Sequence, residues 1–173
     1  APRHFVWRRE YRVFYAISAL FGIRKQIFYV FGTWVLVDIH RVPVSPIATL
    51  MFLGAGLGVV MRPLLGDVID WAGERLVLAV DEVLLALICL VYAFADRVFP
   101  AGGVFWALAA AYVFDQVLFA LRVARTTYLK KIAVDPADIT PTMTLGVTID
   151  HAVAMSLPIV SGWLWTHLGY EWV

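Results

Sequence analysis

Five long apolar stretches, separated by short runs rich in proline, glycine or charge, constrain this sequence more than any other feature. They cover approximately residues 14–37, 47–65, 76–95, 103–124 and 141–165. A bilayer core ~30 Å thick is crossed by about 20 helical residues, so each stretch is long enough to span a membrane. Because unpaired backbone polar groups are not tolerated against lipid, all five are predicted to be helices.

The composition favours a membrane protein over other classes. Hydrophobic residues make up 62% of the chain, against roughly 45–50% in soluble domains. A net charge of +1 provides no basic field for nucleic acid. We therefore predict an all-α integral membrane protein with the lipid bilayer as partner: a five-helix transmembrane bundle forming a single membrane domain over residues 1–173. A soluble all-helical domain is the alternative. The absence of an initiating methionine and an apolar run beginning at the end suggest a piece of a longer protein.

Lysine and arginine are distributed unequally between alternate connections. Only Arg41 and Arg97 belong to one side, whereas ten cations belong to the other: Arg3, Arg8, Arg9, Arg12, Arg62, Arg75, Arg122, Arg125, Lys130 and Lys131. Because short cytoplasmic loops are enriched in these residues, the N-terminus is predicted to be cytoplasmic. An odd number of spans then places Val173 on the opposite side.

The second break, GDVIDWAGER (residues 66–75), is suited to a tight hairpin because glycine accepts backbone angles that other residues resist. The stretch RPLLGDVIDWAGER also resembles the signature loop of the major facilitator superfamily, Gly-x-x-x-Asp-Arg/Lys-x-Gly-Arg/Lys-Arg/Lys, through Gly66, Asp70, Gly73 and Arg75. Trp71 and Glu74 stand where the family usually has cations. The match is therefore to the degenerate copy of this loop, which joins helices eight and nine.

This resemblance implies a C-terminal half of a transporter, with the five spans as helices seven to eleven of a partial major facilitator superfamily fold. It implies a secondary active transporter of a small-molecule substrate that works by alternating access between this half and a missing N-terminal half. Coupling to a proton stays open. The hairpin would act as a cytoplasmic gating loop, and the expected location is the bacterial inner (plasma) membrane. A non-transporting helical scaffold or accessory subunit is the alternative function.

Polar residues within the first and fourth spans are candidates for substrate or ion binding, because an ionisable group in a membrane usually faces protein or water. Lys25 and Tyr29 lie on one helical stripe, and Arg24 is rotated about 100° away from them, where it can pair with a neighbouring helix. The fourth span carries one polar face with Tyr112, Asp115 and Gln116. The resemblance makes these spans helices seven and ten, which line the family's central cavity. It therefore implies that five residues converge on substrate: Lys25, Tyr29, Tyr112, Asp115 and Gln116. Two structural alternatives stay open: an ion pair of Asp115 with Lys25 or Arg24, and a hydrogen bond from Gln116 across helices.

The fifth span offers Asp150 and His151 as candidates for substrate binding or for a coupled proton. They occupy different helical faces, so we expect them not to share one partner. Histidine can change charge near physiological pH, although a packed neutral imidazole is equally compatible with the sequence. Asp81 and Glu82 lie two turns inside the third span, where we expect hydration from the cytoplasm or pairing with a loop.

Catalytic chemistry has little support in the sequence. The four histidines lack metal-ligand spacing, and neither a Cys-x-x-Cys motif nor a phosphate-binding glycine loop is present. We therefore expect no enzyme activity, no cofactor and no metal.

Overall fold

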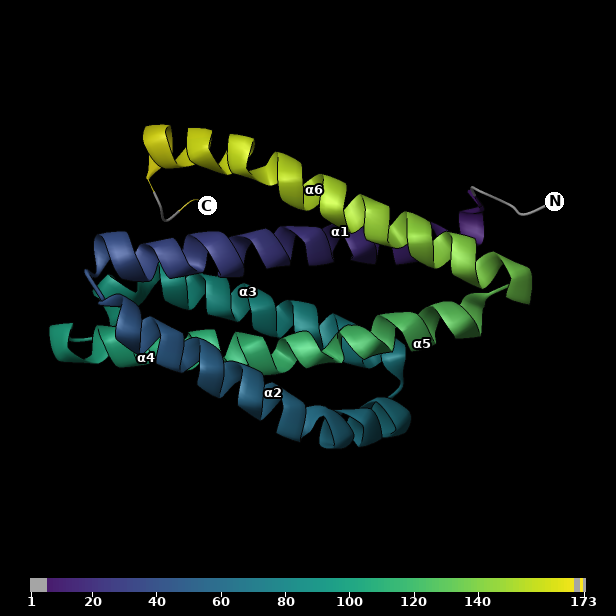
Figure 1. The fold of residues 1–173 in the computed structure, drawn as a ribbon, viewed down its shortest axis with the longest axis horizontal. Helices are drawn as coiled ribbons and strands as arrows, with labels where there is room; N and C mark the ends of the chain where they lie inside the picture. The colour runs from purple at the N-terminus through teal and green to yellow at the C-terminus, as the bar shows by residue number, and fades with distance from the viewer. Residues whose placement is uncertain (1–5, 170–171, 173) are drawn as a thin grey trace.

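The computed structural model describes residues 6–169 and 172, which form an elongated bundle of helices without a strand among them (Figure 1). Arg3 and Val173, on which the predicted membrane orientation partly depends, lie outside the described residues. The first helical segment comprises η1 (Arg9–Tyr11), α1 (Arg12–Gln26), η2 (Ile27–Gly32) and η3 (Val35–Ile39). It is followed by α2 (Val44–Ala72), α3 (Glu74–Val98), a fourth segment of α4 (Ala101–Leu118), η4 (Phe119–Leu121) and α5 (Arg122–Ile132), and a fifth of η5 (Pro136–Asp138) and α6 (Ile139–Leu168).

All five segments are long and apolar enough to cross a membrane, with lengths from 25 to 33 residues. These are the dimensions of an integral membrane protein, since about 20 helical residues are sufficient to span the bilayer core. The prediction of an all-α protein with five such helices is therefore confirmed.

The turn between α2 and α3 is much shorter than the sequence predicts. Gly66 and Asp70 lie within the last two turns of α2, and the chain reverses at Gly73, whose φ of 82° is in the region that favours glycine. Arg75 already belongs to α3. The helix continues through Gly66 because an interior glycine costs only about 1 kcal/mol relative to alanine, too little to end a long apolar helix.

The fourth segment also continues past its predicted end. No glycine or proline occurs between Gly103 and Pro136, so nothing in the sequence interrupts the helix at residue 124. Helix α5 consequently extends to Ile132 and includes Arg122 and Arg125. Assigning these two arginines, and Lys130 and Lys131 of the same helix, to a connecting loop in the charge count was wrong.

Successive segments run in opposite directions along the long axis of the bundle (Figure 1). The short helix η1, the Gly73 turn and the connection 133–135 lie at one end, and the connections 40–43 and 99–100 lie at the other. This alternation agrees with the topology used for the charge count. Which end faces the cytoplasm stays a prediction.

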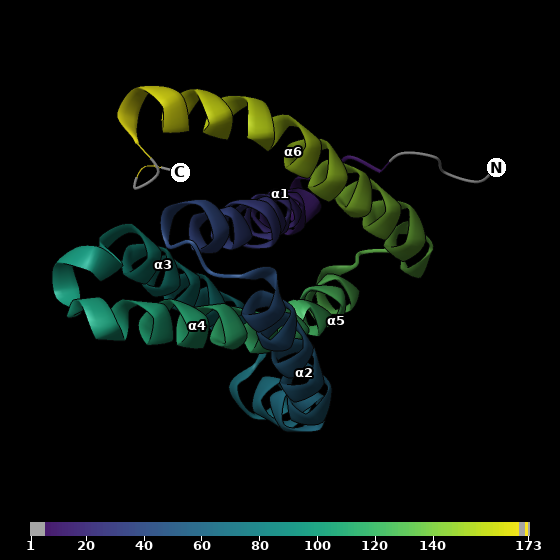
Figure 2. The ribbon, with the colours of Figure 1, turned by 60° about the vertical axis from the view of Figure 1, so that its left-hand side comes forward.

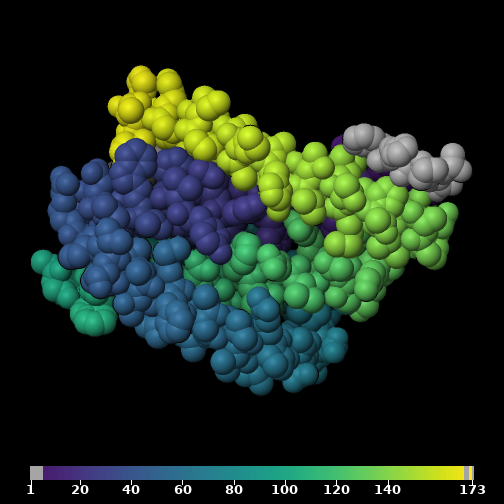
Figure 3. Space-filling model, in the orientation of Figure 1, coloured from purple at the N-terminus to yellow at the C-terminus, as the bar shows by residue number. Residues whose placement is uncertain are grey.

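Helix α6 packs mainly against α1, whereas α2 packs mainly against α4, so α2 and α6 form the two outer edges (Figures 2 and 3). Both contacts depend on glycine. A Cβ atom at Gly22 of α1 would overlap the carbonyl oxygen of Asp150, and one at Gly54 of α2 would lie 2.8 Å from Cβ of Gln116. Small residues bring helix backbones together in this way in membrane bundles.

A polar cluster connects the N-terminal arm to the segment that precedes α6. The Tyr11 hydroxyl donates to Oδ2 of Asp138 (3.1 Å) and accepts from the backbone N–H of Val134 (3.0 Å). Arg8 Nε lies 3.0 Å from the same Asp138 oxygen, and the Asp138 side chain is fully buried. These contacts fix the start of α1 beside the start of α6.

Candidate functional site

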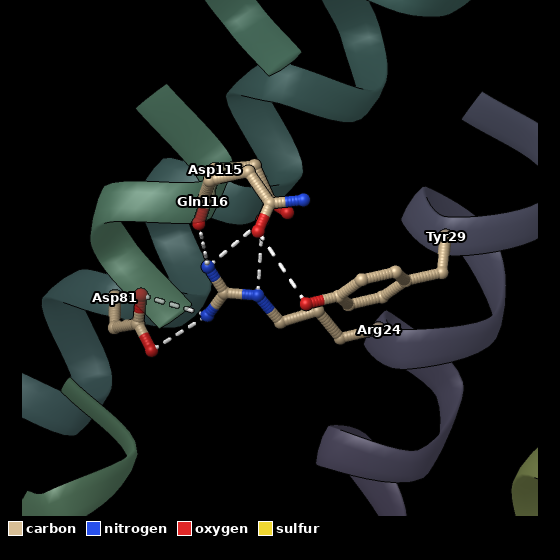
Figure 4. Close-up of polar contacts among 5 residues, drawn as sticks. All are labelled: Arg24, Tyr29, Asp81, Asp115 and Gln116. Carbon is tan, nitrogen blue, oxygen red and sulfur yellow. Dashed lines mark hydrogen bonds and ion pairs between the residues drawn. The ribbon is translucent and has the colours of Figure 1, made fainter. Parts of the chain in front are cut away.

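Arg24 occupies the centre of the bundle and joins three helices. Its Nη1 donates to both carboxylate oxygens of Asp81 on α3, at 3.0 and 2.9 Å. Its Nε and Nη2 donate to Oδ1 of Asp115 on α4, at 3.0 and 2.8 Å, and Nη2 also reaches the Asp115 carbonyl oxygen at 3.2 Å. The guanidinium group therefore lies between two carboxylates (Figure 4), and we call these three residues the Arg24 cluster.

The Arg24 cluster is almost completely shielded from solvent. The exposed fractions of Arg24, Asp81 and Asp115 are 2%, 0% and 2%. The expectation of a hydrated Asp81 was therefore wrong. Asp81 belongs to the buried face of α3, beside Val77 and Leu78, and the long side chain of Arg24 reaches it there from α1.

A cavity of about 520 Å³ opens between α1, α5 and α6. Its lining is both charged and aromatic, and consists of Phe21, Lys25, Gln26, Tyr29, Phe119, Arg122, Arg125, Val147, Asp150 and His151. Lys25 Nζ lies 3.7 Å from Oδ1 of Asp150, so these two residues form an ion pair across the α1–α6 contact. His151 is exposed and its Nδ1 lies 2.9 Å from the carbonyl oxygen of Val147. We call this the central cavity.

The residues predicted to bind substrate fall into two groups. Lys25, Tyr29, Asp150 and His151 line the central cavity together. Asp150 and His151 nevertheless contact different partners, as expected, because Asp150 pairs with Lys25 and His151 lies against the carbonyl oxygen of Val147. Adjacent helix positions differ by about 100°, which a cavity of this width accommodates.

Tyr112 and Asp115 are buried and do not contribute to the lining of the central cavity. Of the two ion-pair partners expected for Asp115, the structure pairs it with Arg24 and not with Lys25. Gln116 accepts a hydrogen bond from the Tyr29 hydroxyl at 3.4 Å (Figure 4) and lines a smaller cavity of about 260 Å³ with Gly58 and Arg62.

Phe119 lines the central cavity and also contacts the Arg24 cluster. The guanidinium carbon of Arg24 lies 5.8 Å from the centre of the Phe119 ring, and that of Arg122 lies 5.5 Å from it. The ring also contacts the rings of Phe21 and Tyr29, with centroids 6.3 and 6.0 Å away. The buried charges and the open cavity thus have one aromatic wall in common.

Arg122 and Arg125 were not among the predicted site residues, although both line the central cavity. Helical spacing contains a signal for them. Positions 115, 118, 122 and 125 follow the i, i+3, i+7 and i+10 pattern of one helix face, which continues the polar face of the fourth span. Assigning both arginines to the connection after the fourth span concealed this continuation.

No protein-family model, no curated protein and no solved structure matches this chain.

Proposed function

We propose that this chain belongs to a secondary active transporter of a small molecule and that the central cavity forms part of its substrate pathway. The observation that carries this proposal is the gathering of ionisable side chains from three helical segments around one open cavity. Lys25 comes from α1, Arg122 from α5 and Asp150 from α6. Charged residues within membrane spans usually face protein or a water-filled path, and such residues mark routes for substrates and ions.

The chain is proposed to be the C-terminal half of a major facilitator superfamily transporter, with α1 to α6 forming helices seven to eleven. The other half would close the open side of the central cavity, and alternating access would expose the site to each side in turn. Exposed polar side chains of α6, such as His151 and Thr148, are better suited to water or protein than to acyl chains. In this proposal the N-terminus is cytoplasmic and the membrane is the bacterial inner membrane.

The alternative function is a non-transporting scaffold or accessory subunit. The Arg24 cluster favours it, because a buried and fully hydrogen-bonded charge group holds helices together without any substrate. The two functions make different demands on Lys25 and Asp150, which line the cavity outside that cluster.

Transport by the whole protein in liposomes distinguishes the two functions. The liposomes are incubated with a mixture of metabolites, and the solutes accumulated inside are identified by mass spectrometry. We expect at least one solute to be enriched over empty liposomes, with its uptake strongly reduced by Asp150→Asn. Lys130→Gln, an exposed cation on α5, is the control and should leave uptake unchanged. A protein that enriches no solute, or whose uptake is insensitive to Asp150→Asn, contradicts the transporter proposal.

A further inference from the structure

Positive charge exceeds negative charge on the walls of the central cavity. Among the described residues that line it, Lys25, Arg122 and Arg125 are cationic and Asp150 is the acidic one. Asp150 is already engaged by Lys25 at 3.7 Å. The Arg24 cluster has one excess negative charge, but none of its three residues lines the cavity and both of its carboxylates are hydrogen-bonded to Arg24. The two arginines of α5 are therefore the cations with no dedicated carboxylate.

Arg125 carries an unsatisfied donor. Its Nη1 is buried and has no hydrogen-bond acceptor among the described residues. Its guanidinium carbon lies 4.9 Å from the centre of the Phe21 ring and 6.0 Å from that of Phe14, so two aromatic rings lie close to it. A buried N–H without an acceptor costs free energy, and an anion entering the cavity would supply the missing acceptor.

The rest of the cavity wall is suited to an apolar group. Phe21, Tyr29, Phe119 and Val147 provide aromatic and aliphatic surface beside the arginines. A volume of about 520 Å³ falls within the range of roughly 300–1,000 Å³ that is typical of small-molecule sites. Guanidinium groups bind carboxylate and phosphate oxygens through paired N–H donors, so the wall combines an anion site with an apolar platform.

We propose that the central cavity binds small organic anions, with a carboxylate or phosphate held by Arg122 and Arg125 and an apolar or aromatic body against Phe21 and Phe119. The proposal rests on the proposed function in taking this cavity as the substrate site, and it adds the chemical class of the substrate. The headgroup of an anionic lipid has the same chemistry, so the experiment separates this source from a soluble anion.

Three probes with one ring system and different charges test the proposal: naphthoate, naphthamide and naphthylmethylamine. Their affinities for the whole protein are measured by titration calorimetry in nanodiscs of phosphatidylcholine. We expect naphthoate to bind at least tenfold more tightly than naphthamide, and the amine to bind most weakly. Tenfold corresponds to about 1.4 kcal/mol, the scale of one hydrogen bond to a charged group.

Arg122→Gln shows whether the preference arises in the cavity. Arg122 is exposed and forms no ion pair with a described residue, so its substitution removes charge without breaking a buried contact. We expect this variant to lose about tenfold in naphthoate affinity, in the range for one charge-assisted contact, and to bind naphthamide as before. Lys130→Gln removes an exposed cation from the same helix and should leave both affinities unchanged.

Four results would overturn the anion site. The first two are equal affinity for naphthoate and naphthamide, and tighter binding of the amine than of naphthoate. The third is a loss of naphthoate affinity in Lys130→Gln as large as that in Arg122→Gln. The fourth is that neither naphthoate nor naphthyl phosphate binds at millimolar concentration. Nanodiscs containing phosphatidylglycerol distinguish the source of the anion. If they abolish naphthoate binding, the site is occupied by a lipid headgroup and the soluble substrate is contradicted; unchanged binding supports the soluble anion.

Failure of this inference is distinguishable from failure of the proposed function. Binding of naphthoate that depends on Arg122, in a protein that enriches no solute in liposomes, supports the anion site and contradicts transport. Enrichment of cationic or neutral solutes, without preferential naphthoate binding, supports transport and contradicts the anion site.

Discussion

Replacing Arg24 with methionine tests whether the Arg24 cluster holds the bundle together. Methionine keeps much of the length of the arginine side chain and removes its charge and its five hydrogen bonds to Asp81 and Asp115. Both carboxylates are buried, so neither can turn to water when the guanidinium group is lost. The variant therefore leaves two acidic groups, close to one another, without a counter-charge.

The magnitude follows from the burial of both partners. Removing one member of a buried ion pair costs about 3–5 kcal/mol, because the remaining charge is left uncompensated. Arg24→Met removes the partner of two carboxylates at once, which places the expected loss toward the upper end of that range. Asp81→Asn should cost only about 1 kcal/mol, because Arg24 keeps its pair with Asp115 and the cluster loses its excess negative charge.

Equilibrium unfolding in detergent, followed by tryptophan fluorescence and circular dichroism, measures these differences. The triple variant Arg24→Met, Asp81→Leu, Asp115→Leu provides the decisive comparison. Since apolar residues can replace a complete buried ion pair at little cost, this variant should recover most of the stability lost in Arg24→Met. If it is no more stable than Arg24→Met, or if Arg24→Met is as stable as the native protein, the electrostatic explanation is refuted.

Two further substitutions test the contacts that position the helices. Gly54→Ala should destabilise the α2–α4 contact by about 1–3 kcal/mol, because its Cβ would lie 2.8 Å from Gln116. Gly56→Ala, which meets open space in the same helix, is the control and should leave stability unchanged or raise it by up to ~1 kcal/mol in the same unfolding assay. Tyr11→Phe removes the hydroxyl that joins Asp138 and the backbone N–H of Val134, so it should cost about 1–3 kcal/mol. Faster hydrogen exchange confined to residues 133–138 would support this explanation, and unchanged exchange there would contradict it.

Much of the helical architecture could be predicted from the sequence, because a membrane-spanning helix needs only length and apolarity. Helix ends were less predictable. Gly66 and Asp70 are residues that often occur in turns, but the structure keeps both helical and reverses the chain at Gly73. Turn propensities of about 1 kcal/mol are small beside the backbone hydrogen bonds that a continuing helix satisfies.

The candidate site was predictable to the extent that it depends on single helix faces. Helical spacing places Lys25 and Tyr29 on one stripe, and both line the central cavity. Asp81 could not be assigned in this way, because its contact with Arg24 depends on how α3 rotates against α1, and the periodicity of one helix does not fix its rotation relative to another. Burial of such residues is decided by packing among three helices.

Two arginines beside Phe119 show why residue type and depth do not determine a role. Arg24 and Arg122 lie at similar distances from this ring, yet the nitrogens of Arg24 are hydrogen-bonded to aspartates of two helices, whereas Arg122 pairs with no carboxylate among the described residues. A guanidinium group whose donors are all satisfied has little to gain from a ligand, so Arg24 is suited to holding helices together. One with free donors beside a cavity can gain a charge-assisted contact, so Arg122 is suited to binding an anion. The number of acceptors around each group separates the two roles, and that number depends on the packing of the helices.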